Sequence, residues 1–267
     1  MIMTNETKAR SKFSKYKKQE PKAVRDFKVN KDPKIESLRR LCGDLLSDPS
    51  RQAEIKKEIQ ATGHMFTAED VEKFSLILRE FEDSSAFELW AGPFLNVVMQ
   101  ASRDNDFILR LHNISSPIHD LGAENDKNLT IHGGKHEFLG NRKEQGIIRV
   151  HDAMATFLGI GLNGAEIHFH GDVHDPVGPG MEEGLIVVYG NVIPNDYYTP
   201  EGIADNPFET VTGQDMVNGL IEIRGNAAAS IGHGMMGGEI HLEGDYVSIG
   251  DVGKGTIYHK GKIILSK

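Results

Sequence analysis

The sequence predicts a mainly β protein, a right-handed parallel β-helix with coils of about 19 residues, preceded by a small α-helical region. Three observations predict it. A glycine-punctuated segment recurs, most clearly as GLIVVYGN (184–191), GLIEIRGN (219–226) and GEIHLEGD (238–245), at steps of mostly 19 residues. Apolar and polar residues alternate within each copy, as in strands. Most of the 29 glycines lie in this half, which excludes a helical repeat.

Two apolar columns run through the predicted strands. Residues two apart on a strand share a face, and β-branched residues suit that pleated surface. Coils that stack on one another place equivalent positions side by side, so both columns should form buried ladders. The columns are Leu129, Ile148, Ile167, Ile186, Ile221, Ile240 and Ile257, and Ile131, Val150, Phe169, Val188, Ile223 and Leu242.

Between the apolar positions lie two columns that should face outward. We expect Arg224, Glu243 and Lys260, which end one of them, to form a charge ladder on neighbouring coils. The columns are Thr130, Arg149, His168, Val187, Glu222, His241 and Tyr258, and His132, His151, His170, Tyr189, Arg224, Glu243 and Lys260.

A further glycine column follows each strand, and we expect it to form a corner of the coil because glycine tolerates positive φ and close backbone approach. Three residues later comes a mostly apolar column that predicts a second inward-facing stretch. The columns are Gly140, Gly159, Gly178, Gly213 and Gly232, and Lys143, Leu162, Met181, Met216 and Met235.

Residues 32–115 are expected to be helical. Asp32-Pro33 suits the start of a first helix, and Thr67 with Asp70 resembles the capping box of a second. A third apolar stripe follows residue 85, and Gly92-Pro93 within it should break or kink that helix. A boundary is expected at 103–124, with the solenoid occupying 125–267. The helical region either caps the first coil, whose edge would otherwise be open, or forms a separate docking module.

Composition limits the partners and the compartment. Residues 1–31 carry ten Lys/Arg and three Asp/Glu, a net charge of +7 that leaves −16 for the rest because the total is −9. We expect a disordered, solvated basic tail; docking on an acidic partner or nucleic acid is the alternative, although the acidic body disfavours nucleic acid as the main partner. The sequence has no long apolar run and no signal-like segment, so we expect no membrane partner. Cys42 is the one cysteine and cannot form an internal disulfide, so we expect a cytoplasmic protein.

The stretches SIGHGMMGGEIHLEGD (230–245), PVGPGMEEGLIVVYGN (176–191) and FLGIGLNGAEIHFHGD (157–172) resemble the GXGXG β-helix domain. That domain occurs in the C-terminal part of the glutamate synthase large subunit, and in one component of formylmethanofuran dehydrogenase and of the related formyltransferase/hydrolase complex. The resemblance covers roughly residues 125–261 and implies the fold. It also implies a structural role without reactive residues, as in glutamate synthase. The helical region and the tail lie outside the pattern.

Several short motifs are explained by the repeat. Residues 159–164 and 232–237 both fit GxGxxG, but each leads into another strand, so we interpret them as coil corners without a nucleotide. His151, His168 and His170 are weak metal candidates, since neutral imidazoles on adjacent strands suit Zn²⁺, although the period alone also explains their spacing. We expect no cofactor, and no catalytic constellation stands out.

An insertion near 194–209 interrupts the repeat, and Tyr197, Tyr198 and Phe208 within it are the predicted contact residues. The sequence therefore favours a non-catalytic assembly subunit that binds protein partners or its own copies, in the manner of a glutamate synthase-like complex. One alternative is a component of a formylmethanofuran dehydrogenase or formyltransferase/hydrolase complex that contributes to an active site or channel. Another is a metal or small-ligand binding module.

Overall fold

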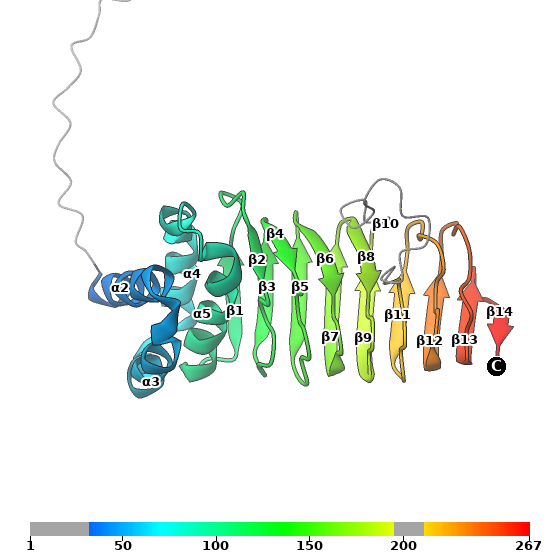
Figure 1. Ribbon diagram of the computed structural model, residues 1–267, viewed down its shortest axis with the longest axis horizontal. Helices are drawn as coiled ribbons and strands as arrows, with labels where there is room; N and C mark the ends of the chain where they lie inside the picture. Colours follow the sequence, from blue (N-terminus) through cyan, green and yellow to red (C-terminus); the bar gives the residue numbers. More distant parts are fainter. Residues whose placement is uncertain (1–31, 195–210) are drawn as a thin grey trace, which may run out of the picture. The chain divides into compact units, whose positions relative to one another are not determined.

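The computed structural model describes residues 32–194 and 211–267. The basic tail, 1–31, lies outside the described residues, as do the contact residues predicted in the insertion, Tyr197, Tyr198 and Phe208. The helical region precedes the strands, as predicted, and the described strands form a parallel β-solenoid (Figure 1).

The described helical region holds four α-helices, one more than the sequence predicted. The additional helix, α3, buries only Ile55 and Ile59, which is too narrow a stripe to stand out in the sequence. Helix α5 continues through Pro93 and is not broken there. The helices are α2 (Pro33–Ser47), η1 (Pro49–Arg51), α3 (Gln52–Thr62), η2 (Gly63–Met65), α4 (Ala68–Ile77), η3 (Leu78–Phe81) and α5 (Phe87–Ala101).

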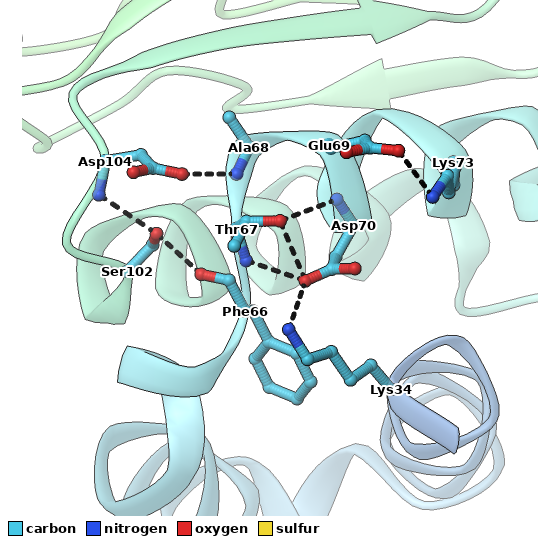
Figure 2. Close-up of polar contacts among 9 residues, drawn as sticks. All are labelled: Lys34, Phe66, Thr67, Ala68, Glu69, Asp70, Lys73, Ser102 and Asp104. Carbon is cyan, nitrogen blue, oxygen red and sulfur yellow. Dashed lines mark hydrogen bonds and ion pairs between the residues drawn. The ribbon is translucent and has the colours of Figure 1, made fainter. Parts of the chain in front are cut away.

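The predicted capping box at the start of α4 is confirmed. The Thr67 hydroxyl accepts from the Asp70 amide, and the Asp70 carboxylate accepts from the Thr67 amide at 2.8 Å. Figure 2 shows that Lys34 of α2 reaches the same carboxylate at 3.0 Å. Burial alone would raise the pKa of Asp70, but the hydrogen bonds from Thr67 and Lys34 lower it. This ion pair therefore ties α2 to α4.

A second set of contacts in Figure 2 fastens the chain after α5 to the start of α4. The Ala68 amide donates to the Asp104 carboxylate at 2.6 Å, and the buried Ser102 hydroxyl donates to the Phe66 carbonyl at 2.8 Å. These bonds satisfy backbone groups that helix ends leave without partners. The helical region is thus fixed at the point where the chain enters the solenoid.

The larger sheet has nine strands in the order β1-β3-β5-β7-β9-β11-β12-β13-β14, side by side in Figure 1. Every pairing in it is parallel except that of β13 with β14, which is antiparallel. The strands are β1 (Asp106–Arg110), β3 (Asn128–His132), β5 (Ile147–His151), β7 (Asn163–His170), β9 (Glu183–Val188), β11 (Leu220–Ile223), β12 (Met236–Leu242), β13 (Lys254–His259) and β14 (Lys262–Ser266).

A second, five-stranded parallel sheet has the order β10-β8-β6-β4-β2. Its strands alternate along the chain with those of the first sheet, so each of these coils contributes one strand to each sheet. The strands are β2 (Pro117–His119), β4 (Lys135–Glu137), β6 (Met154–Leu158), β8 (Val173–Val177) and β10 (Val192–Ile193).

The predicted strand register is confirmed. Ile148 pairs with Ile167, and the register continues across the insertion, where Ile186 pairs with Ile221. Both apolar columns are buried throughout. The columns that start at Gly140 and Lys143 also behave as predicted: the five corner glycines have φ between 64° and 72°, and the five residues of the inward column are fully buried.

The solenoid starts one coil earlier than predicted, because β1 and β2 already form a coil within residues 106–119. Phe107 pairs with Leu129, a step of 22 residues that the 19-residue pattern does not match. The corner glycine of this coil is Gly122, with φ 72°. Leu121-Gly122 is the counterpart of Leu139-Gly140, and this was the sequence signal for the first coil.

The helical region caps the first coil, which decides between the two alternatives left open by the sequence. Helix α4 packs against β1, and α5 packs against β2. The Arg110 amide donates to the Ser75 hydroxyl at 2.9 Å. Buried residues of the helices and of the coils form one continuous hydrophobic core, and it includes Cys42, where burial raises the thiol pKa to about 12. The helices therefore cover apolar surface that an end coil would expose to water.

Candidate functional site

A row of stacked side chains runs across the outer face of the nine-stranded sheet. We name it the histidine ladder. Its ring centroids are 6.2 Å apart between the first two imidazoles, then 5.3, 4.5 and 4.0 Å, and the paired rings lie within 20° of parallel. The ladder consists of His112, His132, His151, His170, Tyr189 and Arg224.

The ladder follows from the repeat. Parallel strands with identical register place equivalent side chains about 4.8 Å apart, which suits stacked rings. His132, His151 and His170 occupy one register column. Because each ring face lies against the next ring, a partner could reach an imidazole of the ladder only at the edge of its ring, where the nitrogens lie.

The ladder ends in a tyrosine and an arginine. The Arg224 guanidinium lies 4.4 Å from the centre of the Tyr189 ring, within the range of a cation–π contact. Arg224 also lies 3.7 Å from the Glu222 carboxylate. The predicted charge ladder is therefore wrong for the described residues: Arg224 turns to Tyr189 and Glu222, and Lys260 pairs with Asp245 at 3.0 Å.

Two imidazoles of the ladder are shifted toward the neutral form. Partial burial lowers the pKa of His132, and the neighbouring His151 lowers it further. The same two causes, in the same order, lower the pKa of His170. A neutral imidazole both donates and accepts a hydrogen bond, so the His132 and His170 rings offer mixed polar groups with little charge.

The structure brings two of the three weak metal candidates together, but not as a ligand set. His151 and His170 stack face to face, with ring centroids 4.5 Å apart. His168 lies in the neighbouring column, 3.4 Å from both Glu166 and the Tyr189 hydroxyl. Within residues 32–194 and 211–267, no three His, Cys, Asp or Glu side chains gather as a metal site would require.

One position in that neighbouring column departs from the prediction. Val187 was expected to face solvent, yet it is only 3% exposed. Its register neighbours, His168 and Glu222, carry longer side chains. Beside the ladder, the outer face therefore includes an apolar position surrounded by polar side chains.

Sequence reasoning missed a cleft between the helical region and the first coil, which we name the junction cleft. Its volume is about 420 Å³. Asn96 of α5 crosses to the coil: its amide nitrogen donates to the Asp120 carbonyl at 2.7 Å, and its oxygen accepts from the Gly122 amide at 2.8 Å. Asparagine within a helix gave no signal because its partners come from a coil that the repeat pattern did not reveal.

Lys143 supports the floor of this cleft from inside the protein. Its position belongs to the inward column otherwise filled by leucine and methionine, and it is fully buried. Its ammonium group donates to the Asn125 carbonyl, the Asn125 side chain and the Lys127 carbonyl at 2.7, 2.8 and 2.9 Å. Burial lowers the pKa of Lys143 to about 8, so the group remains largely protonated at neutral pH.

Two further buried titratable groups lie in the five-stranded sheet. Burial raises the pKa of Asp175 to about 6, and the carboxylate accepts from the Thr212 hydroxyl at 2.7 Å. Burial lowers the pKa of His136 to about 4; its Nε2 lies 3.0 Å from the Gly133 carbonyl, and its Nδ1 has no partner in the part of the chain that the structure describes.

The two GxGxxG segments occupy coil corners, as the repeat predicts. Gly159 and Gly232 each have positive φ, and each precedes the next strand of the solenoid and not a helix. This is not the strand–turn–helix context of a dinucleotide site.

The comparisons with known proteins identify no relative. No family model, curated protein or solved structure matches this chain. Among the described residues, no helix has the length and hydrophobicity needed to cross a bilayer.

Proposed function

We propose that this chain is a non-catalytic assembly subunit whose solenoid holds a protein partner against the histidine ladder. The observation that carries the proposal is the order already present in the ladder. Each ring is held by its neighbours before a partner arrives, with centroid separations down to 4.0 Å. Binding therefore costs little additional side-chain entropy, which favours affinity in protein interfaces.

The composition of the ladder supports a protein partner. Tyrosine and arginine are enriched at the energetic centres of protein interfaces, and here Tyr189 and Arg224 are in contact. The His132 and His170 rings, whose pKa values are lowered, offer hydrogen bonds without a large desolvation cost, because neutral groups are cheaper to bury than charged ones.

The resemblance to the GXGXG domain directs the proposal to a glutamate synthase-like complex, in which the solenoid would hold catalytic chains together. A role within a formylmethanofuran dehydrogenase-like complex is the alternative, since the same type of domain occurs there. Tagged protein isolated from its native extract distinguishes the two by the chains that remain bound. An amidotransferase or flavin-binding synthase supports the first complex, and a formyl-transfer enzyme supports the second.

Alanine substitutions test whether the ladder is the binding surface. Tyr189→Ala with Arg224→Ala should release the partner, whereas Met154→Ala should not, because Met154 is exposed on the five-stranded sheet. A chain that stays monomeric in its native extract and turns over a substrate alone contradicts the assembly role.

A further inference from the structure

The junction cleft is bounded by two walls with opposite charge. Helix α3 supplies Gln52, Lys56 and Gln60, which are four residues apart and so share one face of the helix. The turn that follows β2 supplies Asp120 and Glu124. Helix α5 contacts both α3 and β2 and so connects the walls. A cation on one wall and carboxylates on the other give the cleft a dipolar field.

The floor of the cleft is fixed by its own hydrogen bonds. Asn125 donates to the Asn96 oxygen at 3.3 Å and accepts from Lys143, while Asn141 donates to the Asp120 carboxylate at 3.1 Å. These side chains are committed to partners within the protein. The floor is therefore organised before a ligand enters, which lowers the entropic cost of binding.

The rim differs from the floor. Gln52, Lys56, Gln60 and Gln100 are exposed, as is Glu124. Lys56 and Glu124 make no ion pair with any other residue that the structure describes. Each glutamine amide can both donate and accept hydrogen bonds. The rim thus holds one ammonium group, one carboxylate and several amides that are free to contact a ligand.

The cleft has the size of a small-ligand site and room beyond it. Ligand pockets usually measure about 300–1,000 Å³, and this one is about 420 Å³. A neighbouring cavity of about 390 Å³ shares Gln100, Glu124 and Asn125 with it. A ligand whose charged end lies between the walls can extend an attached group into the neighbouring cavity.

We propose that the junction cleft binds a free α-amino acid. The ligand carboxylate pairs with Lys56, the α-ammonium group pairs with Glu124 and with Oδ2 of Asp120, the oxygen that does not accept from Asn141, and the side chain extends toward Gln100. A zwitterion satisfies both walls at once, whereas a simple anion or cation would meet repulsion from one of them. This site is separate from the histidine ladder, and the proposal stands or falls independently of the assembly role.

Calorimetric titration of the whole chain with each protein amino acid tests the proposal. We expect saturable binding of at least one amino acid, weakened about tenfold or more by Lys56→Gln and by Glu124→Gln, since each removes a charge-assisted contact. Lys57→Gln and Glu182→Gln are the matched controls, because both residues are exposed and neither lines the cleft. Both controls should bind like the parent.

Modified ligands test the need for both charges. For the amino acid that binds best, the N-acetylated form and the amine lacking the carboxylate should each bind at least about tenfold more weakly. Three results overturn the proposal: no amino acid binds at concentrations up to about 10 mM; the Lys56 and Glu124 variants bind like the parent; or either modified ligand binds as well as the zwitterion.

Discussion

A β-carbon on Gly159 would lie 2.6 Å from Cδ1 of Ile186, which belongs to the buried column of the next coil. The same relationship recurs at Gly140, Gly178 and Gly213, where the isoleucine carbon would be 2.6–2.8 Å away. The corner glycine therefore serves two purposes: it adopts positive φ, and it leaves room for the isoleucine of the following coil.

We predict that Gly159→Ala lowers the free energy of unfolding by more than Gly180→Ala does. Both glycines have φ near 65°, so both substitutions introduce about 1–2 kcal/mol of backbone strain. A β-carbon on Gly180 would meet nothing within 4 Å, so only Gly159→Ala adds a clash with the core. Urea denaturation measures both variants, and equal losses would contradict the packing explanation.

We predict that Ile240→Ala destabilises the solenoid by about 2–5 kcal/mol, because it removes buried methyl groups and leaves a cavity. Ile240 is fully buried and pairs with Ile221 and Ile257. Val247→Ala is the control, since Val247 is 74% exposed, and its effect should stay within about 0.5 kcal/mol. A stable Ile240→Ala variant would show that the observed register is incorrect.

We predict that Lys143→Met destabilises the protein by about 1–3 kcal/mol at pH 7, although methionine matches the rest of its column. The substitution leaves the Asn125 and Lys127 carbonyls without the donor that Lys143 supplies. Leu162→Met, in the same column one coil away, preserves volume and should cost less than about 1.5 kcal/mol. Thermal unfolding compares the two variants, and a Lys143→Met protein as stable as its parent would show that the buried ammonium group is not needed.

We predict that the stability of Asp175→Asn, measured relative to the parent protein, is higher at pH 7 than at pH 4. Because burial raises the pKa of Asp175 from 3.8 to about 6, the folded protein retains a proton that the unfolded chain releases. The stabilising effect of the protonated carboxyl in the parent is complete below about pH 4 and is lost as the pH rises through about 6. Asparagine does not titrate and can still accept from Thr212.

The stability of Asp175→Asn relative to the parent should thus improve by up to about 3 kcal/mol between pH 4 and pH 7. Urea denaturation at both pH values measures the difference, and the measurement at pH 4 is the internal reference. A difference that does not change between pH 4 and pH 7 would mean that burial does not raise the pKa of Asp175.

Much of the solenoid was predictable because every coil repeats the same physical requirement. Ile186 and Ile221 align across an insertion, and the sequence indicated this because the apolar columns and corner glycines resume in phase after it. The first coil was missed since Phe107 lies 22 residues before Leu129 and its strand lacks a closing glycine.

The sites were less predictable than the fold. The His151–His170 stack follows from the period of the repeat. Arg224, in contrast, contacts Tyr189 and Glu222 and not Glu243 as predicted. The period does not indicate which of several neighbours a long side chain contacts. The junction cleft depends on Asn96 reaching a turn 24 residues later, for which the sequence carries no periodic signal.

The most direct test of the assembly role is site-specific photo-cross-linking in the native extract. A photoreactive phenylalanine analogue at His151 lies within the ladder, and the same analogue at Met154 lies on the five-stranded sheet. We predict that the His151 probe yields one discrete cross-linked partner and that the Met154 probe does not capture it. Equal capture from both positions, or none from His151, would contradict the claim that the histidine ladder holds a partner.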